Sequence, residues 1–202
     1  MTFRNQRDGV FTLDPGKAAF VIIDMQNSSC VPSSGNPLPH IREVIDKINL
    51  LADFCRGKRI PVIWVRHSIA SRGKSNDAGL YTLFHQEARI QDMMNRSRGT
   101  ELFPDMHFSP SRDHVVFKNR YSAFLSQPPE LEQKLQLLRK SQILVAGIAA
   151  NACVESTVRD AMQLDYEVVL VSDGTTAANE SLLRVLWRTP VASSGMYLAR
   201  EK

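Results

Sequence analysis

Short apolar runs alternate with segments of helical periodicity along most of the chain. The apolar runs predict buried strands at residues 18–23, 60–65, 115–118, 143–147 and 168–171. Apolar positions at helical spacing predict helices at residues 41–55, 80–94, 129–138, 153–164 and 179–187. Strands that alternate with helices form right-handed crossovers, so the sheet should be mostly parallel with helices on both faces. Residues 191–202 suggest a weak last strand, which would give the sheet six strands. We therefore expect one α/β domain over residues 1–202 with a three-layer, Rossmann-like fold.

Composition argues against several classes of function. The 202 residues fit one domain, and the net charge of +4 comes from scattered basic residues, so nucleic-acid binding is not expected. No run approaches the roughly 20 apolar residues of a membrane span, and the N-terminus lacks the apolar core of a signal peptide. Cys30, Cys55 and Cys153 form no paired framework, which favours a reducing, cytoplasmic compartment. No GxGxxG follows the first strand, so a dinucleotide site is unsupported. We expect no cofactor.

Three chemically reactive side chains fall at the ends of predicted strands. Asp24 follows the first, Lys118 ends the third, and Cys153 lies where the fourth hands over to a helix. Ligands of open parallel sheets bind beyond these ends. The unpaired N–H groups and the dipole at a helix start favour a thiolate, which Lys118 could also stabilise, while Asp24 could take the thiol proton. Each residue alone is more often structural, but their coincidence at one sheet edge predicts nucleophilic catalysis.

Four segments carry a resemblance to a known family. Together they resemble the isochorismatase-like cysteine hydrolases, and they span residues 19–27, 61–67, 118–124 and 147–160. The resemblance implies that Asp24, Lys118 and Cys153 form a catalytic triad. It also implies a non-proline cis peptide between Ile148 and Ala149, with the N–H groups of Ala149 and Cys153 forming an oxyanion hole for acyl transfer.

Branches of this family differ in metal use and in the bond they cleave. Nicotinamidases bind a metal through an Asp-x-His after the second strand, but no Asp stands two residues before His67 here, so we expect no metal. Isochorismatases that cleave vinyl ethers do not need the thiol, so the presence of Cys153 favours hydrolysis of a C–N bond. The string Lys-Asn-Arg-Tyr-Ser-Ala-Phe from Lys118 looks most like the ureidoacrylate, N-carbamoyl and biuret-type amidohydrolases.

The resemblance also suggests which side chains contact the substrate. The candidates are Gln26, Asn27, His67, Tyr121 and Ile148. For Tyr121 a packing role is an equal alternative, and a lone histidine such as His67 is more often structural. The sequence departs from the family pattern directly after Asn27 and again in the segment that follows residue 179.

The sequence therefore favours a metal-independent cysteine hydrolase. It would cleave a C–N bond of a small amide or ureido/carbamoyl compound through a covalent thioester-type intermediate on Cys153. The alternatives are an isochorismatase-type vinyl-ether hydrolase and, from another class, a redox-sensing or partner-binding protein in which Cys30 could resolve an oxidised Cys153. We expect a small-molecule substrate, no nucleic-acid or membrane partner, and a homo-oligomer, either a dimer or a tetramer.

Overall fold

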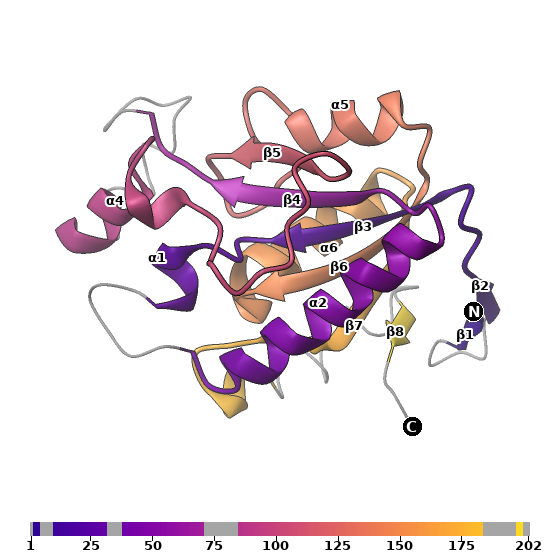
Figure 1. Cartoon of the computed structure of the whole chain (residues 1–202), viewed down its shortest axis with the longest axis horizontal. Helices are drawn as coiled ribbons and strands as arrows, with labels where there is room; N and C mark the ends of the chain where they lie inside the picture. The colour runs from indigo at the N-terminus through magenta and orange to yellow at the C-terminus, as the bar shows by residue number, and fades with distance from the viewer. Residues whose placement is uncertain (1, 5–9, 32–37, 71–84, 184–196, 200–202) are drawn as a thin grey trace.

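A single parallel sheet forms the centre of the molecule (Figure 1). The structure is a computed structural model that describes residues 2–4, 10–31, 38–70, 85–183 and 197–199. The six strands lie in the order β5-β4-β3-β6-β7-β8, and every neighbouring pair is parallel. Their bounds are β3 Ala18–Ile23, β4 Val62–His67, β5 His114–Lys118, β6 Gln142–Ile148, β7 Glu167–Thr176 and β8 Tyr197–Ala199. The predicted α/β class and parallel sheet are thus confirmed.

Helices cover both faces of the sheet (Figure 1). All six residues of β3 are buried, and alternate residues point to opposite faces. One face packs against α5 (Glu130–Leu137) and α6 (Glu155–Gln163), which contribute Leu131, Leu135 and Val158 to its core. The other packs against α2 (Ile41–Gly57). Because β3 contributes to both of these apolar cores, its sequence is a continuous hydrophobic run.

The helices follow from their apolar spacing and their ends. In α2 the buried positions include Val44, Ile45, Ile48 and Ala52, which share one face of the helix. Two acidic residues lie in the first turn of α5, where they interact favourably with the positive end of the helix dipole. No helix among the described residues is long and apolar enough to cross a membrane.

Several boundaries differ from the sequence prediction. Strand β4 begins at Val62 rather than residue 60 because Pro61 has no N–H for the strand ladder. The expected helix over residues 80–94 is the shorter α4 (Glu87–Met93), and residues 71–84 lie outside the described residues. Of the predicted helix at 179–187, residues 180–183 are helical and the remainder is not described.

Some of the other elements were not predicted. A short antiparallel hairpin of β1 (Thr2–Arg4) and β2 (Val10–Thr12) precedes the sheet. The loop after β3 contains α1 (Asn27–Cys30), and the irregular segment before β5 contains η1 (Arg98–Thr100). The weak strand expected in the tail is β8, which adds a short parallel edge beside β7.

Candidate active site

The sheet brings the predicted triad together at the carboxyl ends of its central strands. Asp24 directly follows β3, and Lys118 ends β5. Cys153 follows β6, which pairs with β3 on the side opposite to β4. Parallel pairing places the ends of these strands at one edge, so residues more than a hundred positions apart in sequence become neighbours.

Asp24 is held in place by its backbone. Its φ of 52° lies in the left-handed region, which Asp tolerates better than most residues. The backbone N–H of Asp24 donates to the Val65 carbonyl at 3.0 Å, and the Asp24 carbonyl accepts from the Gln26 N–H at 2.8 Å. The side chain is buried. The chain therefore turns sharply as it leaves β3, which fixes the carboxylate at the sheet edge.

Lys118 reaches across β4 to join the other two members. Its strand is two positions from β3, about 10 Å at the usual strand spacing. The Lys118 Nζ donates to Asp24 Oδ2 at 2.9 Å, to Cys153 Sγ at 3.1 Å and to the Arg120 carbonyl at 3.0 Å. An ammonium has three donors, so all three are used although its side chain is 0% exposed.

Cys153 lies in a widened helical turn rather than at the start of an α-helix. The residues Ala150–Val154 form the π-helical turn η2, and α6 begins at Glu155. Gly147 permits the approach of β6 to β3. Its φ is +116°, and a Cβ there would overlap the backbone of Ile23. The peptide bond between Ile148 and Ala149 is cis.

The charges of the site are strongly coupled. Burial lowers the pKa of Lys118, but the charges and hydrogen bonds of Asp24 and Cys153 outweigh it and raise the pKa above its ordinary value. Burial, followed by the charge of Asp24, raises the pKa of Cys153 to about 12, against the opposing effect of Lys118. At neutral pH the site therefore holds an ammonium and a thiol. The thiolate that the sequence predicted is not the resting form, because burial and the charge of Asp24 outweigh the effect of Lys118.

A cavity of about 440 Å³ opens beside the thiol. Its lining includes the predicted residues Asp24, His67, Tyr121, Ile148, Ala149 and Cys153.

Gln26 and Asn27, by contrast, are not among its lining residues. The Gln26 side chain is buried, accepts from the His67 N–H at 2.6 Å and donates to the carbonyls of His67 and Thr100. The Asn27 amide donates to the Arg98 carbonyl at 2.9 Å. Both residues therefore hold the loops around the cavity together, and contact of either with the substrate stays a prediction.

Sequence reasoning missed several residues that line the cavity. The additional lining residues are Ser28, Ser29, Leu38, His85, Gln86, Arg89, Met93 and Ala152. His85, Arg89 and Met93 are spaced four residues apart, which is the periodicity of one helix face. That spacing was a usable signal, but the helix over 80–94 was judged by its apolar residues alone.

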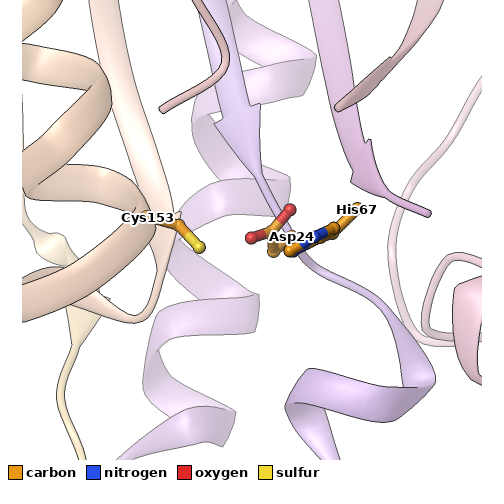
Figure 2. A group of neighbouring side chains, drawn as sticks. All are labelled: Asp24, His67 and Cys153. Atoms are coloured by element: carbon orange, nitrogen blue, oxygen red, sulfur yellow. The ribbon is translucent and has the colours of Figure 1, made fainter. Parts of the chain in front are cut away.

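Asp24, His67 and Cys153 could together coordinate a cation (Figure 2). One possible ligand atom from each lies within 4.8 Å of the others, and all three residues are buried. Burial, then the charges of Lys118 and Arg89, lowers the pKa of His67 well below its usual value, so its imidazole is neutral. The Lys118 ammonium, however, already contacts both the carboxylate and the thiol, and its charge opposes a second cation.

The two other cysteines are unpaired and buried. Burial is the largest cause that raises the pKa of Cys30 and Cys55, in each case to about 12. Neither lines the cavity beside Cys153. These surroundings do not favour the redox-sensing alternative, because a resolving cysteine reacts as an accessible thiolate.

Fold and site together define a parallel α/β protein with a thiol, an ammonium and a carboxylate at the carboxyl edge of its sheet. The isochorismatase domain family matches residues 18–188, and the chain belongs to this family. The resemblance on which the sequence prediction rested is thereby confirmed.

Individual relatives are distant in sequence but close in fold. A protein of Arabidopsis thaliana described as a probable inactive nicotinamidase is 26% identical over 166 residues, which are 81% of this chain and 83% of that protein. The crystal structure of a cysteine hydrolase from Pseudomonas syringae pv. phaseolicola 1448A has a TM-score of 0.80 at 22% identity, covering 98% of this chain and 92% of the other. N-carbamoylsarcosine amidase from Thermoplasma acidophilum has a TM-score of 0.72 at 21% identity, covering 91% and 96%.

Proposed function

We propose that the chain is a cysteine hydrolase that cleaves a C–N bond of a small amide or of a ureido or carbamoyl compound. The observation that carries this proposal is the buried Lys118 ammonium, which contacts Asp24 Oδ2 at 2.9 Å and Cys153 Sγ at 3.1 Å beside a cavity. Family membership alone does not carry it, because one relative bears the description inactive. A nucleophile, a base and a positive charge in contact are groups suited to the hydrolysis of an amide.

The first half of the reaction forms a covalent intermediate. Asp24 Oδ1 is buried and accepts no hydrogen bond from any described residue, so it is available to take the thiol proton. The Cys153 sulfur then attacks the substrate carbonyl carbon, and the C=O electron pair moves to oxygen. When this tetrahedral species collapses, the C–N bond breaks, and the departing nitrogen takes the proton from Asp24. The product is a thioester, or a thiocarbamate when the substrate is a carbamoyl compound.

Water completes the cycle. Asp24 removes a proton from water, the resulting hydroxide attacks the acyl carbon, and the C–S bond breaks. The thiolate recovers the proton from Asp24, and the acid product leaves. Lys118 stays protonated throughout and balances the negative charge on whichever partner carries it. The N–H groups of Ala149 and Cys153 would stabilise the oxygen anion in both tetrahedral species.

The proposed reaction uses no metal. Lys118 supplies the positive charge that a metal ion would otherwise provide, and it contacts two of the three candidate ligands at once. A divalent ion at this position would have to displace or deprotonate a buried ammonium whose pKa is raised by the same two partners.

Replacement of the triad tests the proposal. Turnover of a panel of small amides and ureido acids is measured by the release of ammonia, and Cys153→Ala should abolish it. Cys153→Ser should be nearly inactive because a hydroxyl has a much higher pKa than a thiol. Asp24→Asn and Lys118→Ala should each reduce kcat/KM by about a hundredfold or more, and the losses should not add because the three groups act as one unit.

One outcome would replace the proposed reaction. If Cys153→Ala kept near-native turnover while Asp24→Asn did not, the carboxylate alone would suffice. The vinyl-ether reaction, which Asp24 could run by protonation, would then become the leading function, and isochorismate with pyruvate release would be the assay.

A further inference from the structure

Arg89 presents a cation to the cavity that holds the triad. It lies on α4 and lines the same cavity as Cys153. One guanidinium nitrogen, Nη1, donates to the Ser28 carbonyl, which ties α4 to α1. A guanidinium has five N–H donors, so this bond leaves most of them for another acceptor. Among the described residues, Arg89 forms no ion pair.

The described residues that line the cavity offer no negative charge that balances the charge of Arg89. Asp24 is the only carboxylate among the described lining residues, and Lys118 neutralises it. Burial and then the charge of Arg89 lower the pKa of His85, and His67 is shifted in the same direction. Both imidazoles are therefore neutral at pH 7. The described residues that line the cavity, taken together with Lys118, therefore carry one net positive charge.

The neighbours of Arg89 add uncharged hydrogen-bonding groups to the same wall. The His85 ring nitrogen Nε2 lies 3.1 Å from the Tyr121 hydroxyl. The positive charge of Arg89 acts on the pKa of Tyr121 as well as on both histidines. The guanidinium is therefore within electrostatic range of other groups that line the cavity.

We propose that Arg89 binds a carboxylate of the substrate. The substrate class then narrows to small amides or carbamoyl compounds that carry a carboxylate at the end away from the scissile bond, as N-carbamoyl amino acids do. Arginine suits this task because its planar donors match the two oxygens of a carboxylate. The inference about which bond is cleaved rests on the function proposed above, whereas the binding of the carboxylate does not depend on turnover.

Matched pairs of compounds test the carboxylate site directly. The probes are N-carbamoylglycine and N-carbamoyl-β-alanine, each compared with its primary amide, which has nearly the same shape without the charge. Binding is measured by titration calorimetry in the Cys153→Ala variant, where no turnover can occur. At least one acid should bind about tenfold or more tightly than its amide, because a hydrogen bond to a charged group is strong.

Three further variants in the same background locate the effect. Arg89→Gln should remove the preference for the acid while binding of the amide is retained, which also shows that the cavity is intact. Arg89→Lys should keep part of the preference, since the charge remains without the planar fork. Arg98→Gln removes the same charge from an exposed residue that does not line the cavity, so it should keep the full preference.

The outcomes separate this inference from the proposed function. Acids that bind no better than amides, or a preference that survives Arg89→Gln, would overturn the carboxylate site, as would a failure of both acids to bind. Turnover of the same pairs by the unaltered protein is scored independently. Selective binding without hydrolysis would refute the proposed reaction alone. Equal hydrolysis of acid and amide would refute the carboxylate site alone.

Discussion

At the scale of single residues, the resting state of Cys153 matters most. Burial and the charge of Asp24 raise the pKa of this thiol to about 12, while Lys118 acts in the opposite direction. A thiol that stays protonated is protected from unwanted reactions at neutral pH. It becomes a nucleophile only when a neighbour removes its proton, so Asp24 has two opposing effects: it suppresses the free thiolate and enables the reaction.

Asp24→Asn separates these two effects. Removal of the negative charge should lower the pKa of Cys153 and increase the thiolate fraction at pH 8, so alkylation of Cys153 by iodoacetamide should accelerate on the order of tenfold. Turnover should nevertheless be lost, because the base is gone. Lys118→Ala should slow alkylation. Mass spectrometry of the peptides gives the rate, and Cys30 and Cys55, both 0% exposed, are internal controls. Slower alkylation in Asp24→Asn would show that the carboxylate does not hold the proton on sulfur.

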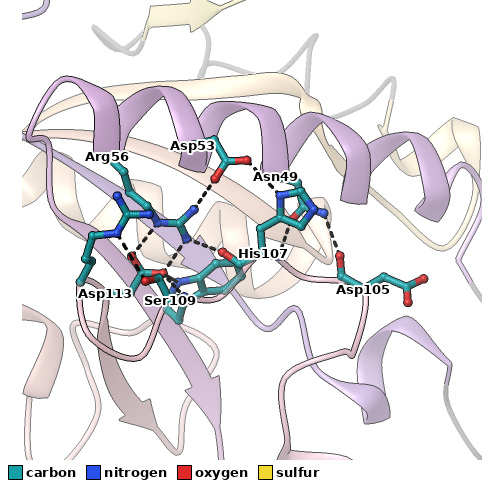
Figure 3. A network of polar contacts seen from close by, with 9 residues as sticks. Asn49, Asp53, Arg56, Asp105, His107, Ser109 and Asp113 are labelled. Carbon is teal, nitrogen blue, oxygen red and sulfur yellow. Dashed lines mark hydrogen bonds and ion pairs between the residues drawn. The ribbon is translucent and has the colours of Figure 1, made fainter.

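At the scale of elements, a polar network attaches α2 to the segment before β5 (Figure 3). The carboxylate of Asp113 accepts from Arg56 Nε at 2.9 Å, from Trp64 Nε1 at 2.9 Å and from the Ser109 N–H at 2.9 Å. Its side chain is 0% exposed and that of Arg56 is 5% exposed. Asn49 on α2 holds the same segment through the backbone of Asp105 and His107.

Asp113→Asn should strongly reduce the stability of the protein. It leaves the Arg56 charge buried without its main partner, and such a change typically costs about 3–5 kcal/mol in the free energy of unfolding. Chemical denaturation at pH 7 measures this loss. The matched control is Asp53→Asn, whose carboxylate also contacts Arg56 but is 54% exposed, so it should cost less than about 1 kcal/mol. Equal losses in the two variants would mean that burial of the Asp113 pair does not set its contribution.

The same pair predicts a pH dependence. Burial raises the pKa of Asp113, but its bonds to Arg56, Ser109 and Trp64 outweigh burial and bring the pKa below the ordinary value of 3.8. The unfolded state therefore binds more protons below that pH, and the stability from Asp113 is full above it and declines as the pH falls further. Between neutral pH and pH 3, the stability of Asp113→Asn should consequently decrease less than that of the unaltered protein. A parallel decrease in both would contradict this assignment.

The sequence predicted the elements whose burial gives their apolar residues a regular spacing. It did not predict contacts between residues that are far apart in the chain. Strand β3 and helix α5 were found closely because their apolar residues face packed layers on the sheet. Asp24, Lys118 and Cys153 were found because parallel topology puts strand ends at one edge. Arg89 was missed because its helix was predicted from apolar positions, which do not show that a polar residue on it lines a cavity. The pairing of Arg56 with Asp113 spans 57 positions, and no local pattern specifies it.

At the scale of the whole molecule, the order of the strands in the sheet determines which charged groups meet in the triad. Lys118 can reach Asp24 only because β4 alone separates β5 from β3, and the same arrangement places His67 of β4 beside them. The sheet thus brings together Asp24, His67 and Cys153, which resemble a set of metal ligands. The Lys118 ammonium, however, already contacts Asp24 and Cys153.

Exhaustive chelation should therefore leave activity unchanged, with no stoichiometric zinc, iron or manganese in the active protein. Added Zn²⁺ should inhibit, because coordination by Cys153 and His67 would remove the nucleophile and compete with Lys118. Activity and metal content are measured on the same samples before and after dialysis. Loss of activity on chelation, with recovery on the addition of one metal, would contradict the role assigned to Lys118.

The covalent step is the centre of the account, and rapid-quench mass spectrometry of the intact protein tests it most directly. The unaltered protein is mixed with its best amide or carbamoyl substrate and quenched in acid within one turnover. We predict an added mass equal to the substrate minus its amine, located on Cys153 by peptide mapping, absent from Cys153→Ala and decaying as product forms. Turnover by Cys153→Ala at a near-native rate, without any adduct on the unaltered protein, would contradict the account.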